Sequence, residues 1–232
     1  MKSGETALIV GAGSGLSASL ARLLAAEGFH VALAARNPEK LQDLSRTLDA
    51  LALRCDATDA GQVEDAFAAV EKKWAAPDLV VYNAGYRTAG PIAELQPKDV
   101  ERALAVCAFG GFLVGQAAAK RMLAQGAGGI FFTGASASVK GYANSAPFAM
   151  GKFALRGLAQ SMARELAPKN IHVAHFVIDG GIKGGTDPRA AERGDDGMLL
   201  PDEIAKNYLH VYRQHRSAWT WELELRPWLE RF

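Results

Sequence analysis

A cluster of glycines between a short apolar run and a helical pattern is the feature of this sequence best suited to chemistry. The apolar run is Thr6–Val10, the glycines lie in Gly11–Gly15, and the helical pattern is Leu16–Glu27. Glycine permits a tight turn and lets backbone N–H groups approach a phosphate, and the helix N-terminus adds its dipole. The pattern predicts a diphosphate site, with a tight connection that binds nothing as the alternative. The residues predicted to line this site are Gly11, Gly13, Ser14, Gly15 and Leu16.

An arginine follows the second apolar run of the chain. The run is Phe29–Ala34, and Arg36 lies two residues beyond it. In dinucleotide-binding folds an acidic residue in this region binds the ribose 2′-hydroxyl of NAD, whereas an arginine accommodates the 2′-phosphate of NADP through charge-assisted hydrogen bonds. Arg36 therefore favours NADP(H) as the cofactor. NAD(H) is the alternative cofactor, and an ordinary surface arginine is the other interpretation.

The rest of the chain supplies the strands and helices that would position these residues. Strands that are apolar on both faces and separated by helices indicate a parallel sheet covered on both sides. We therefore predict an α/β fold, a Rossmann-type doubly wound sheet with helices on both faces. The expected strands are Thr6–Val10, Phe29–Ala34, Leu51–Arg54, Leu79–Tyr82, Gly129–Thr133 and Ile171–Ile178. The expected helices are Leu16–Glu27, Glu39–Leu48, Gly61–Trp74, Pro97–Gln125 and Ala149–Ala167.

Two further segments follow the sixth expected strand. Asp179–Leu200 is rich in glycine and charge, which predicts a lid over the substrate, with an irregular surface loop as the alternative. A helix is expected from Pro201, and after Ser217 apolar and polar residues alternate, which predicts an edge strand with one buried face. We expect one domain over residues 1–232, with the lid at about 179–200 and the helix and edge strand in 201–232.

The composition argues against several classes of protein. Lys and Arg number 26 and Asp and Glu 25, and this balance gives no support for a nucleic-acid groove or an anionic membrane surface. Cys55 and Cys107 are the only cysteines, too few for a disulfide framework or a zinc cluster, which indicates a reducing compartment. No apolar run approaches the roughly 20 residues of a membrane-spanning helix. We expect a cytoplasmic protein with a small-molecule substrate and without a metal, a nucleic-acid partner or a membrane partner.

Three short motifs occur in order along the chain at the separations of one known family. The glycine turn is followed by Asp56 after the third expected strand and by Asn83-Ala84-Gly85 after the fourth. With these motifs the chain resembles the short-chain dehydrogenase/reductases over nearly its full length. The resemblance implies a nicotinamide dinucleotide as cofactor and about seven strands in the order 3-2-1-4-5-6-7. It places Asp56 and Ala57 on the adenine side of the cofactor, and Asn83, Ala84 and Gly85 beside the cofactor.

The glycine turn departs in part from the T-G-x-x-x-G-[IL]-G pattern of this family. Gly11, Gly15 and Leu16 match, whereas Val10 stands where Thr is usual and Ser17 replaces the last glycine. The diphosphate site is therefore implied by the spacing of three residues and not by the complete motif.

The resemblance also implies a catalytic tetrad, most of which is altered in this chain. In the family, a Tyr four residues before a Lys acts as general acid/base, a Ser about thirteen residues upstream polarises the carbonyl, and an Asn in the preceding long helix completes a proton relay. Lys152 is present, but Phe148 occupies the tyrosine position, Ala135 the serine position and Cys107 the asparagine position. Phenylalanine has no titratable proton, so Phe148 cannot act as an acid.

Three functions are compatible with this altered tetrad. The first and favoured one is a redox enzyme in which Lys152 and Ser136 carry out catalysis, with Tyr142 or Tyr86 as alternative sources of a phenol. It is favoured because the cofactor itself carries the hydride. The second is an NADP(H)-binding pseudoenzyme or sensor. The third, a different chemistry with Cys107 as nucleophile, is least favoured because no base lies beside Cys107 in the sequence.

The resemblance makes two predictions beyond the tetrad. After the sixth expected strand, Gly180 matches the glycine of the family's P-G pair, Asp179 replaces the proline, and the backbone of Ile182 would face the nicotinamide carboxamide. The family commonly pairs through its two long helices, here Pro97–Gln125 and Ala149–Ala167. We therefore expect a homodimer or homotetramer.

Overall fold

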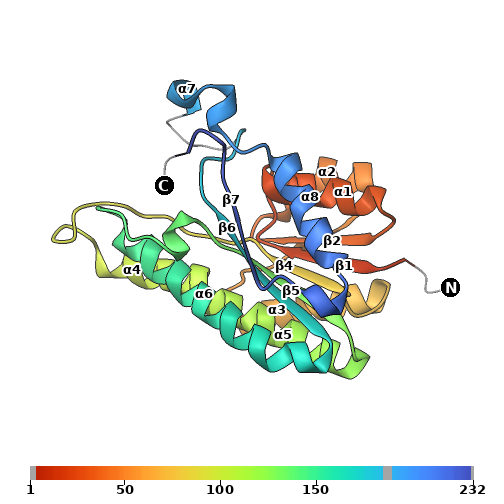
Figure 1. The fold of residues 1–232 in the computed structure, drawn as a ribbon. Helices are drawn as coiled ribbons and strands as arrows, with labels where there is room; N and C mark the ends of the chain where they lie inside the picture. The colour runs from red at the N-terminus through yellow and green to blue at the C-terminus, as the bar shows by residue number, and fades with distance from the viewer. Residues whose placement is uncertain (1–3, 185–189, 231–232) are drawn as a thin grey trace.

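The structure, a computed structural model, describes residues 4–184 and 190–230 and is built around one seven-stranded sheet (Figure 1). All strands are parallel, and their order is β3-β2-β1-β4-β5-β6-β7. This confirms the predicted fold class and the strand order that the resemblance implies. The strands are β1 (Thr6–Val10), β2 (His30–Ala35), β3 (Leu51–Arg54), β4 (Leu79–Tyr82), β5 (Gly128–Thr133), β6 (Ile171–Ile178) and β7 (Glu222–Leu225).

Helices cover both faces of the sheet, with α3, α5 and α6 on one face and α1, α2 and α8 on the other (Figure 1). Strand β1 illustrates why the strands are apolar on both faces. Leu8 and Val10 pack in the core on the α3–α5–α6 side, whereas Ala7 and Ile9 pack on the α1–α8 side. The helices are α1 (Leu16–Ala26), α2 (Gln42–Leu48), α3 (Ala60–Lys73), α4 (Pro97–Leu104), α5 (Gly110–Gln125), α6 (Ala146–Leu166), α7 (Ala190–Arg193) and α8 (Pro201–Tyr212).

The order of the strands reverses between β1 and β4, which are adjacent in the sheet. Ligands of doubly wound sheets bind outside the carboxyl ends of the strands at such a reversal. Gly11 follows β1 and Asn83 follows β4, and the Asn83 N–H donates to the Val10 carbonyl oxygen at 2.8 Å. The glycine turn and the Asn83-Ala84-Gly85 motif therefore meet at the place where the fold provides a crevice.

The long helix expected at Pro97–Gln125 consists of α4 and α5, joined by a π-helical turn over Ala105–Phe109. This 29-residue segment is long and apolar enough to cross a bilayer, by length and composition alone. The search for uninterrupted apolar runs in the sequence did not predict such a segment. Its most apolar part is 44% buried inside the molecule, and Val114, Ala118 and Met122 lie in the core. The segment therefore packs as a core helix of the sheet.

The C-terminal part contains the expected helix and edge strand, with a shifted strand boundary. Strand β7 begins at Glu222 and pairs with β6 at the edge of the sheet, after a 3-10 turn at Arg216–Ala218. Trp219, expected to begin the alternation, stacks on the ring of His172 with ring centroids 4.6 Å apart. The side chain of Trp219 therefore packs on the sheet before the backbone joins β6.

Backbone hydrogen bonds join the two ends of Asp179–Leu200, the segment predicted as a lid. Ile182 and Leu199 form a β-bridge, in which Leu199 N–H donates to the Gly181 oxygen and Lys183 N–H to the Leu199 oxygen, both at 2.8 Å. Residues 185–189 of the segment lie outside the described residues. The lid itself stays a prediction.

Candidate active site

The glycine turn is held in a conformation that leaves its outer side open. Gly11 has φ +84°, and a Cβ there would lie 2.4 Å from the backbone nitrogen of Ala84, so glycine is required. Among residues 4–184 and 190–230, no atom lies within 4 Å of the position that a Cβ would take on Gly13 or Gly15. No side chain of these residues caps the N-terminus of α1, which begins at Leu16. The first N–H groups of α1 are therefore open to an anion, as the sequence predicts.

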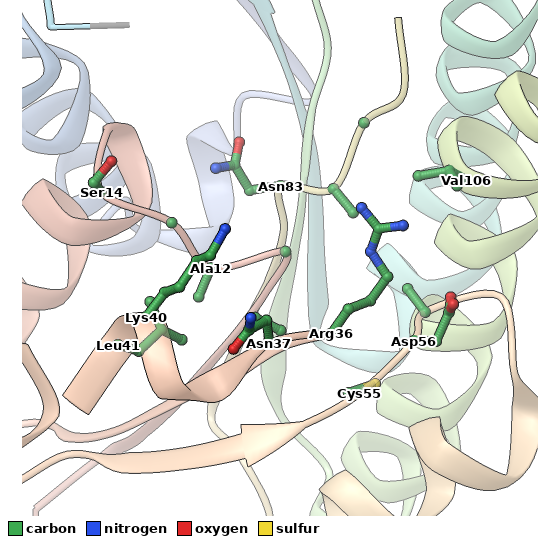
Figure 2. A pocket seen from close by; sticks show the side chains of 16 residues that line it. Ala12, Ser14, Arg36, Asn37, Lys40, Leu41, Cys55, Asp56, Asn83 and Val106 are labelled. Carbon is green, nitrogen blue, oxygen red and sulfur yellow. The ribbon is translucent and has the colours of Figure 1, made fainter.

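A cleft of about 450 Å³ opens beside this turn at the carboxyl end of the sheet (Figure 2). Its walls come from the connections that follow β1, β2, β3 and β4, together with Val106 of the π-helical turn. Most of the residues predicted to bind the cofactor line it; Gly15, Leu16, Lys152 and Ile182 do not. The lining residues are Gly11, Ala12, Gly13, Ser14, Ala35, Arg36, Asn37, Lys40, Leu41, Cys55, Asp56, Ala57, Asn83, Ala84, Gly85 and Val106.

Two cations lie at the β2 side of this cleft. Arg36 and Lys40 are both exposed, and Figure 2 shows both side chains extending from the connection after β2 into the pocket. Within residues 4–184 and 190–230, neither side chain makes a hydrogen bond or ion pair. The acid between them in sequence, Glu39, is bound instead by Arg54 at 2.7 Å. Within the described part of the chain, the two positive charges are therefore not engaged in an ion pair with a carboxylate.

Lys40 was not singled out from the sequence. It lies four residues after Arg36, in the 3-10 turn Pro38–Leu41 that follows β2. The 3-10 turn brings Lys40, the fourth residue after Arg36, back to the cleft. The spacing of two cations four apart after a strand is the signal that could have identified it.

A serine ties the glycine turn to the motif after β4. The Asn83 side-chain amide donates to Ser17 Oγ at 2.7 Å, and Ser17 Oγ donates to the Gly11 carbonyl oxygen at 3.3 Å. Ser17 is the residue that replaces the last glycine of the family pattern. Its hydroxyl gives this turn a side-chain brace that the sequence comparison did not reveal.

Asp56 is fixed by its own turn. Its carboxylate accepts hydrogen bonds from the backbone N–H and the hydroxyl of Thr58, at 3.0 and 2.8 Å, and its N–H donates to the Gln62 side chain at 2.9 Å. These bonds hold Asp56 and Ala57 at the wall of the cleft. The part of the cleft that is predicted to face the adenine is thus held in place by these hydrogen bonds.

Lys152 is the most deeply buried cation of the site, with only 4% of its surface exposed. Its ammonium donates to the Thr133 carbonyl oxygen at 2.7 Å, at the end of β5. Within the described part of the chain its remaining N–H groups have no partner. Gly85 borders it, because a Cβ on Gly85 would lie 3.9 Å from Lys152 Nζ. Burial lowers the pKa of Lys152, an effect that Cys107 partly offsets.

Phe148 lies one helical turn before Lys152 in α6, at the position of the missing tyrosine. The ring centroid of Phe148 is 5.8 Å from Lys152 Nζ, a distance at which the face of the ring attracts a cation. The ring therefore borders the ammonium but contributes no proton to the site.

Cys107 lies in the π-helical turn and is fully buried. Its sulfur accepts from Tyr86 N–H at 3.4 Å and donates to the Tyr86 carbonyl oxygen at 3.5 Å. A Cβ on Gly151 of α6 would lie 2.7 Å from Cys107 Cβ, so the turn and α6 pack closely. Cys107 thus holds the loop after β4, and its burial disfavours a role as nucleophile.

The hydroxyl groups considered as replacements for the tyrosine are placed very differently. Ser136 is half-buried at the start of the 3-10 turn after β5, and its hydroxyl makes no hydrogen bond within the described residues. Ser138 is fully buried, and its Oγ accepts from Ala135 N–H at 3.1 Å. The Tyr86 hydroxyl is engaged by Asp99 of α4 at 3.1 Å, whereas Tyr142 is half exposed. Ser136 is the hydroxyl that remains free beside the end of β5.

Comparison with known proteins identifies the family that this chain matches. The sequence profile described as short chain dehydrogenase matches residues 5–193. D-threitol dehydrogenase of Mycolicibacterium smegmatis is 32% identical over 175 residues, which cover 73% of this chain and 67% of that protein. An uncharacterized oxidoreductase of Staphylococcus aureus is 26% identical over 96% of this chain and 97% of its own.

Solved structures agree with this comparison. A short-chain dehydrogenase from Rhodopseudomonas palustris has a TM-score of 0.84 and 37% identity, covering 97% of this chain and 99% of that chain. A metagenomic short-chain oxidoreductase in complex with NADP has a TM-score of 0.83 and 27% identity, covering 98% and 99% of the two chains. These matches confirm the resemblance, and the chain belongs to the short-chain dehydrogenase family of oxidoreductases.

Proposed function

We propose that this protein is an NADP(H)-dependent oxidoreductase that interconverts a carbonyl and an alcohol on a small molecule without the family's tyrosine. The observation that carries the proposal is the cleft itself. An open glycine turn, the two cations Arg36 and Lys40, which have no ion-pair partner among the described residues, and a buried lysine lie around one edge of the sheet. No other group of residues in the described part of the chain combines an open glycine turn at a helix N-terminus with a buried titratable cation.

The residues present fit a bound NADP(H). The open sides of Gly13 and Gly15 and the uncapped start of α1 would hold the diphosphate. Arg36 and Lys40 would bind the 2′-phosphate, and Asp56 and Ala57 would face the adenine. The metagenomic relative solved with NADP supports this choice of cofactor.

The nicotinamide half would lie at the other end of the site. Lys152 would bind the nicotinamide ribose with one of the two N–H groups that Thr133 leaves free, and the other would face the substrate. The bridge between Ile182 and Leu199 uses backbone groups of Gly181 and Lys183. The N–H and carbonyl of Ile182 are outside that bridge, so they would serve the carboxamide.

Reduction of a carbonyl needs a hydride for carbon and a proton for oxygen. The nicotinamide supplies the hydride when bound. We assign the proton to the Lys152 ammonium, delivered directly or through one water, because burial makes this ammonium a stronger acid than an exposed lysine. Ser136 would donate a hydrogen bond to the carbonyl oxygen. Loss of an optimal general acid costs about 10²–10⁴-fold in rate, so we expect slow turnover.

Cofactor preference is the first test. We expect NADPH to bind more tightly than NADH, and the double substitution of Arg36 and Lys40 to Gln to weaken NADPH binding by about 10²–10⁴-fold, because each of the two charge-assisted hydrogen bonds contributes about 1.5–3 kcal/mol. NADH binding should change little. Fluorescence titration measures both constants, and tighter binding of NADH by the unaltered protein would contradict the proposal.

Turnover is the second test, and it separates the enzyme from a non-catalytic NADP(H)-binding protein. The pseudoenzyme is favoured by the loss of the tyrosine, serine and asparagine at Phe148, Ala135 and Cys107. We expect NADPH consumption with members of a panel of carbonyls and enones, abolished in Lys152→Ala and reduced in Ser136→Ala. Tight NADPH binding without turnover on any compound would favour the pseudoenzyme.

We also propose that the protein forms a homodimer or homotetramer through its long helices. The helices expose large apolar side chains: Phe109 and Phe112 at the π-helical turn and in α5, and Met150 and Phe153 in α6 are each between 41% and 51% exposed. Aromatic residues and Met are enriched in protein interfaces. Light scattering that finds only particles of 24.7 kDa would contradict this proposal.

A further inference from the structure

Arg87 lies two residues beyond the Asn83-Ala84-Gly85 motif, beside the reaction site. Its guanidinium carbon is 5.9 Å from the centroid of the Phe148 ring. The Lys152 ammonium is 5.8 Å from the same ring. Two cations from different elements, the loop after β4 and helix α6, are therefore gathered around the one ring that stands in place of the catalytic tyrosine.

Within the described residues, no ion pair neutralises the charge of Arg87. Its side chain is exposed and makes no hydrogen bond or ion pair there. Asp99 of α4 accepts a hydrogen bond from the hydroxyl of Tyr86, the residue before Arg87, at 3.1 Å. Several other arginines of the fold do have carboxylate partners, such as Arg156 with Glu222 and Arg213 with Glu5.

Phe148 explains why the guanidinium stays near the site. An arginine packs against the face of an aromatic ring by cation–π attraction and keeps its planar set of N–H donors free at the edge. A guanidinium held in this way matches the two oxygens of a carboxylate. Lys152 places a second positive charge 5.8 Å from the centroid of the same ring, and an anionic group is the ligand that would balance these charges.

We propose that the substrate is a short keto acid, or the corresponding hydroxy acid, whose carboxylate is bound by Arg87 while its carbonyl oxygen lies near Lys152. This inference rests on the proposed carbonyl–alcohol activity and names its substrate class. A phosphate ester is the less favoured anion, because we assign Lys152 to the carbonyl oxygen, which leaves the single charge of Arg87 to face the nearly double charge of a phosphate.

The test compares acids with matched neutral compounds on the protein saturated with NADP⁺, so that binding is measured without turnover. The probes are pyruvate, 3-oxobutanoate and 4-oxopentanoate with their methyl esters, and dihydroxyacetone phosphate, each titrated by calorimetry. We expect at least one keto acid to bind ten-fold or more tightly than its ester. Equal affinity for acid and ester across the series, no binding of any acid, or tightest binding of dihydroxyacetone phosphate would overturn the proposal.

Variants assign the preference to Arg87. Arg87→Gln should remove the preference for the acid, and Arg87→Lys should retain part of it, because charge persists but the planar donors are lost. Arg102→Gln is the matched control, since Arg102 packs on the ring of Tyr86 at 4.8 Å and should leave the preference intact. A preference that survives in Arg87→Gln would overturn the assignment.

A prior titration with NADP⁺ separates this inference from the proposed function. All three variants should bind NADP⁺ as the unaltered protein does. Absence of NADP⁺ binding in the unaltered protein would contradict the proposed function, whereas intact NADP⁺ binding without selection for acids would contradict the keto-acid inference alone.

Discussion

The two halves of the site differ in how they depend on the sequence. We define the cofactor half as Gly11–Ser17, Arg36–Leu41 and Asn83–Gly85, and the reaction half as Ala135–Ser138, Phe148–Lys152 and Cys107. The cofactor half is built largely from backbone geometry, as at Gly11, where a Cβ would collide with Ala84. In the reaction half, three of the four side chains that the family uses in catalysis are replaced. Phe148, Ala135 and Cys107 stand at the positions of the Tyr, Ser and Asn.

We infer from this difference that the cofactor half depends mainly on backbone geometry, whereas the reaction half depends on individual side chains. Backbone N–H groups and a helix N-terminus cannot be lost by changing a side chain, so a phosphate site survives divergence of its sequence. A proton donor is lost by a single substitution, as at Phe148. The following changes are chosen to break or sharpen this separation, beginning with the largest expected effect.

Restoring the family's side chains should act on chemistry alone. Phe148→Tyr combined with Ala135→Ser returns a phenol and a hydroxyl to the positions that the family uses, and we expect kcat to rise by about 10²–10⁴-fold. Steady-state kinetics on a substrate found in the panel measures the change. Phe148→Leu, which supplies no proton, is the control. A variant with unchanged kcat would show that the reaction half is not limited by its missing acid.

A β-carbon at Gly11 should damage the cofactor half and the fold together. Gly11→Ala forces φ +84° on a residue with a side chain and places Cβ 2.4 Å from Ala84 N, which we expect to cost about 4 kcal/mol of unfolding free energy. Urea unfolding and NADPH titration measure the two losses. Gly157→Ala is the control, because nothing lies within 4 Å of its Cβ position in α6. Equal stability of the two variants would refute the strain.

Low pH should reduce the free energy of unfolding because of His175, a buried histidine that lies behind the reaction half. His175 is fully buried, its Nδ1 lies 3.0 Å from Glu222, and a Cβ on Gly134 would lie 2.4 Å from its Nε2. Burial, partly offset by Glu222, lowers the pKa of His175 to about 4. The unfolded chain takes up this proton near pH 6.5, so stability is complete above about pH 6.5 and declines as pH falls toward 4.

This decline amounts to about 3 kcal/mol of unfolding free energy, at about 1.4 kcal/mol for each unit of pKa difference. Urea unfolding between pH 4.5 and 7.5 measures it. His175→Gln should flatten the profile, and substitution of the exposed His215 by Gln should leave it unchanged. A profile equally steep in His175→Gln would mean that other groups cause the acid sensitivity.

The smallest expected effect concerns the brace between the glycine turn and Asn83. Ser17→Ala removes the acceptor of the Asn83 amide, and loss of one such hydrogen bond costs about 1 kcal/mol, or about five-fold in NADPH affinity. Ser19→Ala, in the same helix and also buried, should not change the affinity. Unaltered NADPH binding in Ser17→Ala would show that backbone geometry alone maintains the cofactor half.

The parts of the site that could be predicted from sequence are those that follow strand ends directly. Arg36 and Asn83 lie within two residues of β2 and β4, so the topology alone brings them to the crevice. Lys40 required knowledge of a 3-10 turn, and the approach of Arg87 to Phe148 joins a loop to a helix far away in the sequence. Such contacts depend on tertiary packing, which spacing does not encode.

Element boundaries show the same limit. Helix α6 begins at Ala146 and not at Ala149, with Pro147 in its first turn, where proline is tolerated. The π-helical turn at Cys107 is a change of hydrogen-bond register inside one apolar pattern, and residue types alone do not reveal such a change. Leu223 and Leu225 pack against the same core, as the alternation predicts, but Glu222, expected on the polar face, has only 19% of its side chain exposed and binds Arg156 and His175. The strand begins at Glu222 and not at Trp219, whose ring stacks on His172.

The placement of β7 has a consequence for how the protein is made. Glu222 of this strand binds both Arg156 and His175, so the layer beneath the reaction half includes a segment that a ribosome produces after every other strand. The residues that line the crevice around Gly11 are all synthesised before Glu222. A domain generally folds as a unit, and pairings between segments distant in sequence form late. A chain that stops before β7 would therefore contain every residue of the crevice and lack the carboxylate that pairs with Arg156 and His175.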